Sequence, residues 1–265
     1  MKRIKAAFFD LDWTLYNHKD DKWDEKSIEA IKKLKSLGVK VFICTARPYC
    51  SFEWLGAFKL GIDWDGYIAS AGGYCFADGQ YLFTSKIEKE DVEKFIKLAL
   101  ENHATLELVE LKDRKLIAPL TKDAEKHFEH FKEYVPEVRP YEGEDVEGIN
   151  FYCNDSLDEL FIKEFPNLRY WRYAPTSVDV TPFEHEKGKL IKVVLDHYGF
   201  SKDEAIAFGD DYQDLSMAEY VKYFIALGNG KDEVKAAAYY VTDEVWNSGV
   251  AHAIDKIIND DSFLK

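Results

Sequence analysis

The chain has 265 residues, 46% of them hydrophobic and 32% charged, a composition typical of a soluble globular protein with one large domain or two smaller ones. Its formal net charge of −14 makes nucleic acids and anionic membranes poor partners, because the summed field of the protein repels phosphate polymers. The four cysteines form no CxxC pair and no zinc-type grouping with histidine, which is typical of buried thiols in a reducing compartment.

The first thirteen residues, MKRIKAAFFDLDW, begin with basic side chains and continue with an apolar stretch. Asp10 and Asp12 interrupt this stretch, so it is neither a signal peptide nor a membrane span. We therefore expect a cytoplasmic protein.

Short apolar runs and amphipathic segments alternate in the first part of the chain. Residues 4–9 form an unbroken apolar run, typical of a strand that is buried on both faces of a parallel sheet. A helix then begins after Asp24, a suitable N-cap, and ends before Gly38. The predicted elements are a strand at 4–9, a helix at 24–37, a strand at 39–44 and a strand at 67–70.

The same alternation returns near the end of the sequence. The predicted elements there are a helix at 188–198, a strand at 205–208, a strand at 223–227 and a helix at 250–258. Strands that alternate with helices predict an α/β fold, here a doubly wound, Rossmann-like parallel sheet with right-handed crossovers.

The middle of the chain has a different order of elements. A predicted helix at 88–101 precedes strands at 105–111 and 115–118, and further strands follow at 149–153, 168–173 and 177–181. We interpret residues 79–182 as an inserted α+β domain, an antiparallel sheet with helices on one face. The core would then be discontinuous, made of residues 1–78 and 183–265.

A first group of acidic residues, Asp10 and Asp12, follows directly after the first predicted strand. Taken alone, two aspartates in a loop are more often part of a turn than of a site. In an open α/β sheet, however, ligands bind beyond the carboxyl ends of the strands. In such an apolar setting neighbouring carboxylates repel one another unless a cation joins them.

A second group, Asp210, Asp211 and Asp214, follows the buried strand at 205–208. By itself this group fits an acidic helix N-cap. Two acidic groups on the same predicted sheet edge instead indicate a site for a hard cation with oxygen ligands. Mg²⁺ fits best, because it binds one or two carboxylates and keeps waters that a phosphate can displace.

Two further segments are weak signals when taken singly. Thr45, Ala46 and Arg47 follow the second predicted strand, where a hydroxyl and free amides can bind an anion, although an ordinary N-cap explains them better. Lys187 precedes the returning helix, and a lone lysine is normally solvated. These residues become informative only together, through their order in the sequence and their placement beside predicted strand ends.

The full ordered set resembles the motifs of the haloacid dehalogenase superfamily of phosphohydrolases: DxDxT at 10–14, Thr45, Lys187, and GDxxxD at 209–214. The resemblance narrows to the Cof-type sugar-phosphatase branch, in which a large α/β cap is inserted between the second and third motifs. Similar patterns continue to about residue 254, so the likeness covers nearly the whole chain.

This resemblance implies a role for each acidic residue. Asp10 would be the nucleophile that forms an aspartyl phosphate, a covalent route that divides the reaction into two steps. Asp12 would be the general acid and then the base, with a pKa brought near the working pH by neighbouring carboxylates and partial burial. Mg²⁺ would be bound by Asp10, Asp210 and the backbone carbonyl of Asp12, with Asp214 as a direct or water-mediated ligand.

The resemblance also implies a phosphate site. Thr45, the amide of Ala46 and Lys187 would hold the phosphoryl oxygens. Arg47 would either contact the substrate or only anchor its loop. Gln213 occupies a position where the branch usually has asparagine, and its added methylene would shift a hydrogen bond to the phosphate or the metal.

Two other positions depart from the branch: Trp13 replaces the usual glycine, and Ala71 replaces the usual asparagine. The expected substrate is a small phosphorylated metabolite, such as a sugar phosphate, over which the cap would close as a lid. A phosphomutase or phosphotransferase would use the same residues, and a non-catalytic phosphate sensor is a third reading. The oligomeric state is not predicted by any pattern in the sequence.

Overall fold

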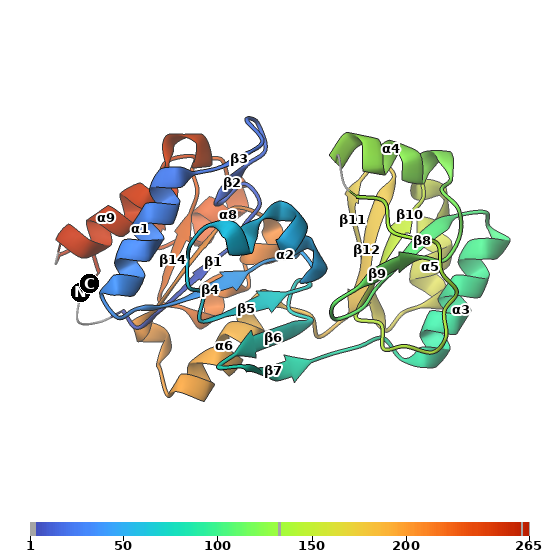
Figure 1. Cartoon of the computed structure of the whole chain (residues 1–265), viewed down its shortest axis with the longest axis horizontal. Coiled ribbons are helices and arrows are strands. Elements are labelled where there is room, and N and C mark those ends of the chain that lie inside the picture. Colours follow the sequence, from blue (N-terminus) through green and yellow to red (C-terminus); the bar gives the residue numbers. More distant parts are fainter. Residues whose placement is uncertain (1–3, 132–133, 261, 265) are drawn as a thin grey trace. The chain divides into compact units, whose positions relative to one another are not determined.

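The computed structural model describes residues 4–131, 134–260 and 262–264, so the basic start of the sequence lies outside the described residues. The chain forms two compact units (Figure 1). The first comprises Met1–Arg47, Phe52–Thr84 and Glu186–Lys265, and the second comprises Pro48–Ser51 and Ser85–His185. Among the helices in the described ranges, none is long and apolar enough to cross a membrane.

An eight-stranded sheet forms the centre of the first unit, in the order β15-β14-β13-β1-β4-β5-β6-β7. Its strands are β1 (Ala6–Phe9), β4 (Lys40–Cys44), β5 (Gly66–Ala69), β6 (Tyr74–Ala77), β7 (Gln80–Thr84), β13 (Ala205–Gly209), β14 (Tyr223–Ala226) and β15 (Tyr240–Val241). The strands from β15 to β5 are parallel, which confirms the expected α/β fold with a Rossmann-like sheet.

The sheet is mixed, because β6 and β7 run antiparallel to their neighbours. These two antiparallel edge strands were not among the predicted elements. Asp78 and Gly79 join the two strands with φ values of +49° and +78°, as a type I′ hairpin turn requires. An Asp-Gly pair between two apolar runs is a strong hairpin signal, so this hairpin was predictable from the sequence.

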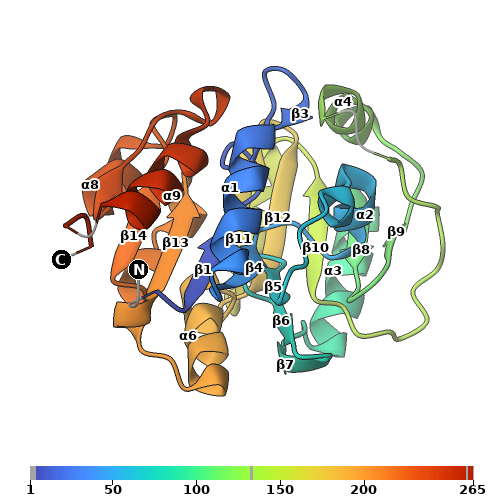
Figure 2. The same ribbon diagram turned by 60° about the vertical axis from the view of Figure 1, so that its left-hand side comes forward.

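Helices cover both faces of this sheet (Figure 2). Helix α1 (Glu25–Ser36) packs against α9 (Gly249–Asn259), whereas α6 (Lys187–Tyr198) packs on the opposite face against β5, β6 and β7. The Asp24 side chain accepts a hydrogen bond from the Ser27 amide at 3.1 Å, which confirms it as the N-cap of α1.

Several short elements complete the first unit and its edges. They are β2 (Tyr16–Asn17), β3 (Lys22–Trp23), α2 (Cys50–Leu55), α7 (Met217–Tyr220), α8 (Asp232–Ala237), and the 3₁₀ turns η1 (Ala57–Lys59), η3 (Lys202–Glu204), η4 (Tyr212–Asp214) and η5 (Val245–Asn247). Strands β2 and β3 form a small antiparallel hairpin that follows β1. Of these elements, this hairpin and η4 shape the site described below.

The second unit is built on a five-stranded antiparallel sheet in the order β11-β12-β10-β8-β9. Its strands are β8 (Thr105–Val109), β9 (Arg114–Leu116), β10 (Gly148–Tyr152), β11 (Leu168–Ala174) and β12 (Ser177–Pro182). Its helices are α3 (Lys89–Glu101), α4 (Lys122–Phe131), α5 (Asp158–Glu164) and the 3₁₀ turn η2 (Asp155–Leu157).

Helices lie on both faces of the second sheet, so the expectation of helices on one face is wrong. Phe151 packs with Phe95 of α3 and Phe161 of α5, with ring centroids 5.2 and 4.4 Å from its own. The next residue along β10, Tyr152, points to the other face and packs against Phe128 of α4 at 5.2 Å. Alternation along the strand thus places α4 opposite α3 and α5.

Glu147, next to the start of β10, is a buried carboxyl group in the second unit. Its Oε2 has no hydrogen-bond partner among the described residues, and burial raises the pKa of Glu147 to about 8. Because the folded state holds a proton that the unfolded state releases, the free energy of unfolding should fall as the pH rises from about 4.5 to about 8. We expect this group to cost roughly 2–5 kcal/mol across that window.

The Glu147→Gln variant keeps the shape of the side chain and removes its titration. Urea unfolding at pH 5, 7 and 8.5 should show the variant more stable than the wild type only at the higher pH values. The exposed Glu129 of α4, replaced by glutamine, is the matched control and should leave the pH dependence unchanged. Equal pH slopes for the wild type and Glu147→Gln would contradict this account.

Candidate active site

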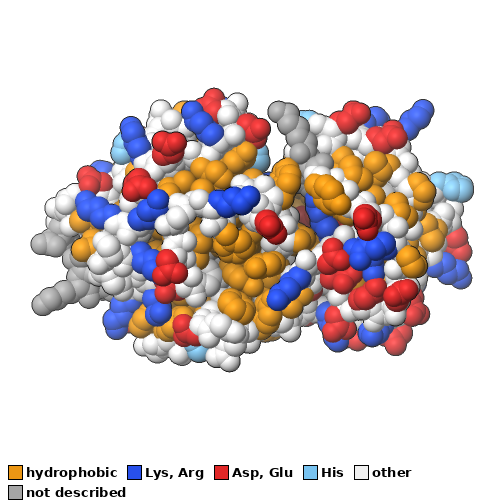
Figure 3. All heavy atoms as spheres, in the orientation of Figure 1, with side chains coloured by type: hydrophobic (Ala, Val, Ile, Leu, Met, Phe, Trp, Pro, Cys, Tyr) orange, Lys and Arg blue, Asp and Glu red, His pale blue; other side chains and the backbone are white. Residues whose placement is uncertain are grey.

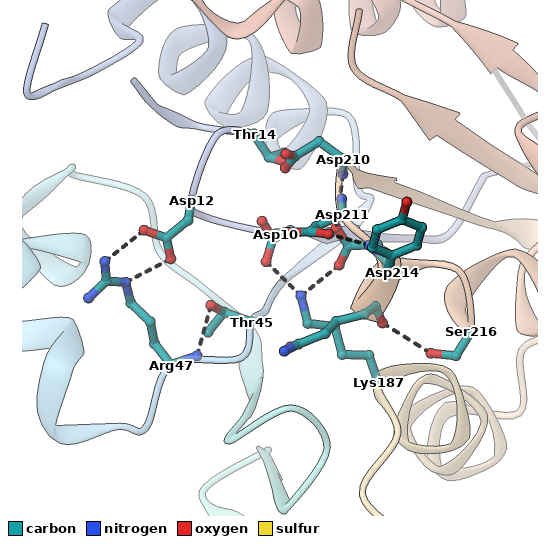
Figure 4. A network of polar contacts seen from close by, with 12 residues as sticks. Asp10, Asp12, Thr14, Thr45, Arg47, Lys187, Asp210, Asp211, Asp214 and Ser216 are labelled. Carbon is teal, nitrogen blue, oxygen red and sulfur yellow. Dashed lines mark hydrogen bonds and ion pairs between the residues drawn. The ribbon is translucent and has the colours of Figure 1, made fainter. Parts of the chain in front are cut away.

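Asp10 and Asp210 lie side by side because the strands that precede them are neighbours. Strands β1 and β13 pair in parallel, with Phe9 opposite Phe208, and the two rings stack with centroids 4.9 Å apart. The Asp10 amide donates to the Phe208 carbonyl at 3.0 Å, so the pairing continues one residue beyond β1. Both carboxylates are therefore fixed at the carboxyl edge of the sheet, where ligands bind in such folds (Figure 4).

Asp214 joins this pair through the 3₁₀ turn η4. One carboxylate oxygen from each of Asp10, Asp210 and Asp214 lies within 4.8 Å of the others, and all three residues are buried. The Asp214 Oδ2 accepts hydrogen bonds from the amides of Asp210 and Asp211 at 2.9 and 3.0 Å. Gly209 makes this close packing possible, because a Cβ there would lie 2.5 Å from the Asp214 Cγ.

Lys187, the first residue of α6, is the cation of this carboxylate cluster. Its Nζ donates to Asp10 Oδ1 at 2.7 Å and to Asp214 Oδ1 at 2.6 Å, and its side chain is buried. Gly188 lets the start of α6 approach closely, since a Cβ there would lie 2.1 Å from the Ser216 carbonyl oxygen. The Gly188 amide also donates to Ser216 Oγ at 3.0 Å, which fixes the helix end.

The cluster holds more negative charge than Lys187 neutralises. Burial raises the pKa of Asp10 to about 8, although Lys187 acts to lower it. Burial and the carboxylates of Asp10 and Asp214 raise the pKa of Asp210 well above its ordinary value. Burial acts to lower the pKa of Lys187, but its two carboxylate partners outweigh this and raise it.

These shifts and the donor set fit a divalent cation. Three buried carboxylates meet at one point, and within the described ranges Lys187 is the only cation that contacts them, so a second cation would stabilise their ionised forms. All the converging ligand atoms are oxygens, which hard cations prefer. Thr14 supports the arrangement, because its Oγ1 donates to Asp210 Oδ1 at 2.9 Å and so orients that carboxylate.

Asp12 lies beside this cluster, but its side chain makes different contacts. Arg47 donates through Nε to Asp12 Oδ2 and through Nη2 to Oδ1, both at 2.7 Å (Figure 4). His18 Nε2 lies 2.7 Å from Oδ1. Burial acts to raise the pKa of Asp12, but Arg47 and His18 outweigh it and hold the pKa well below its usual range. The expectation that neighbouring carboxylates bring this pKa up to the working pH is therefore wrong.

Thr45 lies at the end of β4, fully buried, next to the same sheet edge. Its Oγ1 accepts a hydrogen bond from the Arg47 amide at 3.2 Å, and its amide donates to the Ile68 carbonyl at 2.9 Å. Helix α2 begins only at Cys50, so the amides at 45–47 belong to a loop and not to the first turn of a helix. Arg47 contacts Asp12 in this loop, which favours the anchoring alternative for its side chain.

Two of the three positions that depart from the related branch share a left-handed backbone, and the third has a buried polar side chain. Trp13 and Ala71 adopt left-handed backbones, with φ of +59° and +55°, a region that favours glycine and asparagine. The Ala71 amide donates to the Thr45 carbonyl at 3.2 Å. Gln213, on η4, keeps its side-chain oxygen buried without a hydrogen-bond donor in the described part of the chain.

Three residues that support the site were not predicted from the sequence. Thr14 belongs to the DxDxT pattern but received no role, and Ser216 lies two residues after the second acidic group. His18 could not be found from the sequence, because its contact with Asp12 depends on how the β2–β3 hairpin folds back. Spacing alone gives no signal for such a contact.

Comparisons with known proteins cover nearly the whole chain. The sequence model of the haloacid dehalogenase-like hydrolases matches residues 7–254. The 5-amino-6-(5-phospho-D-ribitylamino)uracil phosphatase YwtE of Bacillus subtilis is 25% identical, over 97% of this chain and 99% of that protein.

Two solved structures are also similar. A hypothetical protein from Geobacillus kaustophilus HTA426 has a TM-score of 0.89 at 28% identity, covering 96% of this chain and 99% of that one. The sugar phosphatase BT4131, of HAD subclass IIB, has a TM-score of 0.80 at 28% identity, covering 96% and 98%. The similarity therefore includes both units of the chain.

Proposed function

The chain belongs to the haloacid dehalogenase-like hydrolases, and from this premise we propose that it is a magnesium-dependent phosphatase that hydrolyses small sugar phosphates through an aspartyl phosphate on Asp10. The family match and the phosphatases among its relatives confirm the expectation of an enzyme that hydrolyses phosphoric monoesters. The metal, the intermediate and the substrate class are our proposal. So is the assignment of residues 79–182 as an inserted cap on a core of 1–78 and 183–265.

One observation supports the proposal most strongly: Lys187 binds Asp10 and Asp214 at the point where Asp210 completes a buried carboxylate cluster. Because Lys187 occupies Oδ1 of Asp10, we assign Oδ2 as the attacking oxygen. In the first step this oxygen forms a bond to phosphorus while the bond from phosphorus to the ester oxygen breaks. The leaving oxygen takes a proton from Asp12, and Asp10 carries the phosphoryl group.

In the second step a water molecule attacks the same phosphorus, its proton passes to Asp12, and the bond to Asp10 breaks to release phosphate. The ionised state of Asp12 suits this base role, because Arg47 and His18 stabilise the carboxylate. The same contacts oppose its protonation, so the acid role in the first step is the weaker one. Phosphate esters whose leaving groups need no proton should therefore be hydrolysed faster than phosphate esters of alkyl alcohols.

The remaining residues bind and orient the phosphate in this proposal. The Thr45 hydroxyl, the Ala46 amide and the Lys187 ammonium would donate hydrogen bonds to the phosphoryl oxygens, and Lys187 already contacts Asp10. Asp10, Asp210, Asp214 and the Asp12 carbonyl would hold Mg²⁺, which would supply positive charge between the carboxylate nucleophile and the phosphate.

The experiment that tests this function compares metal and chelator. Purified protein should hydrolyse p-nitrophenyl phosphate with Mg²⁺, lose this activity in EDTA, and regain it when Mg²⁺ is restored. Mg²⁺ should also raise the melting temperature, because a ligand that binds only the folded state stabilises it.

The Asp210→Asn variant separates the metal site from a general salt effect. It should lose the Mg²⁺-dependent rise in melting temperature, while the exposed Asp211→Asn variant should keep it. Hydrolysis that continues undiminished in EDTA, or an identical Mg²⁺ response in Asp210→Asn, would contradict the metal assignment.

A further inference from the structure

Large hydrophobic side chains are exposed at several places on this chain, and Figure 3 shows hydrophobic side chains gathered on one face of the first unit. Trp54 and Phe58, for example, are 45% and 43% exposed, on α2 and η1. An exposed ring alone therefore indicates nothing special here. Trp13 differs from these rings in its backbone conformation.

Trp13 holds its bulky side chain on a left-handed backbone, with φ of +59°. This region is disfavoured for a residue with a Cβ, most of all for a large one. Two contacts fix the backbone there: the Trp13 amide donates to the Tyr16 carbonyl at 2.9 Å, and Asn229 Nδ2 donates to the Trp13 carbonyl at 2.9 Å. Hydrogen bonds at both the amide and the carbonyl of Trp13 thus hold its left-handed conformation.

Burial of the ring does not account for this unfavourable conformation. The Trp13 side chain is 36% exposed, and its ring lies 5.1 Å from the ring of His18. His18 in turn contacts the carboxylate of Asp12 at 2.7 Å. An exposed aromatic surface is therefore held one side chain away from the proposed acid and base, where the alcohol leaves the phosphate.

We propose that Trp13, supported by His18, is a specificity-determining residue that binds the ring of a cyclic sugar leaving group. This inference rests on the proposed function, since it assumes that Asp12 acts at the ester oxygen. The C–H groups on one face of a pyranose form a flat apolar surface that packs on an indole ring. A short acyclic polyol has no such face, so the Trp13 ring should favour cyclic sugar phosphates over acyclic ones.

The test uses two substrates with similar chemistry at the ester. Glucose 6-phosphate and glycerol 1-phosphate are both esters of primary alcohols, so they make the same demand on Asp12 and differ in the shape of the leaving group. In Trp13→Gly the ratio of kcat/KM for glucose 6-phosphate over glycerol 1-phosphate should fall about tenfold from the wild-type ratio, mainly through KM. Trp13→Phe, which keeps a ring, should stay within about threefold.

Trp246 is the matched control, because its ring is 38% exposed, lies against Lys19, and among the described residues makes no ring contact or hydrogen bond with Asp12 or His18. Trp246→Gly should leave the ratio unchanged. If either phosphate is turned over too slowly, its inhibition constant against p-nitrophenyl phosphate gives the same comparison.

The outcomes separate this inference from the proposed function. Equal losses of kcat/KM for both phosphates in Trp13→Gly would show that the ring only holds the hairpin, and unchanged kcat/KM values for both would show that it does not meet the substrate. Either result overturns the inference while hydrolysis by the wild type continues. Failure of the wild type to hydrolyse any phosphate ester would instead overturn the proposed function.

Discussion

Replacing Asp10 by asparagine is expected to lower the hydrolysis of p-nitrophenyl phosphate by at least roughly a thousandfold, the scale of loss seen when a covalent nucleophile is removed. The amide has the size of the carboxylate but cannot form the aspartyl phosphate. The fold should survive, because Lys187 keeps its bond to Asp214 and one of three mutually repelling carboxylates is gone. Steady-state kinetics and a melting curve on the same sample measure both effects.

Asp211 provides the matched control for this substitution. It is exposed, lies next to Asp210 in sequence, and its Oδ1 accepts a hydrogen bond from the Tyr212 amide at 2.6 Å. Asp211→Asn should keep activity within about threefold and cost no more than about 1 kcal/mol of stability as an altered cap. An Asp10→Asn variant as active as Asp211→Asn would exclude Asp10 as the nucleophile.

Replacing Lys187 by methionine is expected to have the second largest effect, on stability and activity together. Removal of the cation leaves Asp10 and Asp214 buried and facing each other without compensation. Breaking a buried ion pair in this way costs about 3–5 kcal/mol. Loss of a preorganised positive charge at the phosphate should also lower kcat by about a hundredfold or more. Urea unfolding in EDTA measures the first effect without interference from metal.

Lys189 tests whether this loss is specific to the buried lysine. It lies two residues further along α6, is 48% exposed, and pairs with Glu186 at 2.8 Å. Exposed pairs of this kind contribute about 0–1 kcal/mol, so Lys189→Met should change little. A Lys187→Met protein as stable and active as Lys189→Met would show that the ion pairs of Lys187 are dispensable.

Much of the architecture could be predicted because it depends on patterns within short stretches of the sequence. The unbroken apolar runs at β1, β4 and β13 indicate buried parallel strands, and the periodic helices between them fit an α/β sheet. The Asp78-Gly79 hairpin was equally local and was missed because the core was expected to end at residue 78. The face on which α4 packs was harder to predict, because it follows from the burial of Tyr152 and Phe128 in a second small core.

The positions of the site residues at the sheet edge were predictable from the sequence, but the contacts of their side chains were not. Strand order places Asp10 and Asp210 at one sheet edge, so their proximity follows from sequence and topology together. The environment of Asp12 does not follow from the sequence and the strand order. Its low pKa depends on Arg47, which is 35 positions away, and on His18, which reaches it through the β2–β3 hairpin. Such contacts depend on loop geometry, and a pattern of carboxylates alone suggested the opposite shift.

The central claim is that Asp10 carries the phosphoryl group, and a trapped intermediate tests it most directly. In Asp12→Ala the base of the second step is absent, whereas p-nitrophenolate leaves without needing an acid. With Mg²⁺ and p-nitrophenyl phosphate, rapid-quench experiments on this variant should show a burst of about one nitrophenolate per enzyme, the signature of a covalent intermediate. Mass spectrometry should then locate the phosphoryl group on Asp10. Phosphate release without a phosphorylated protein, or a phosphoryl group on another residue, would contradict the account.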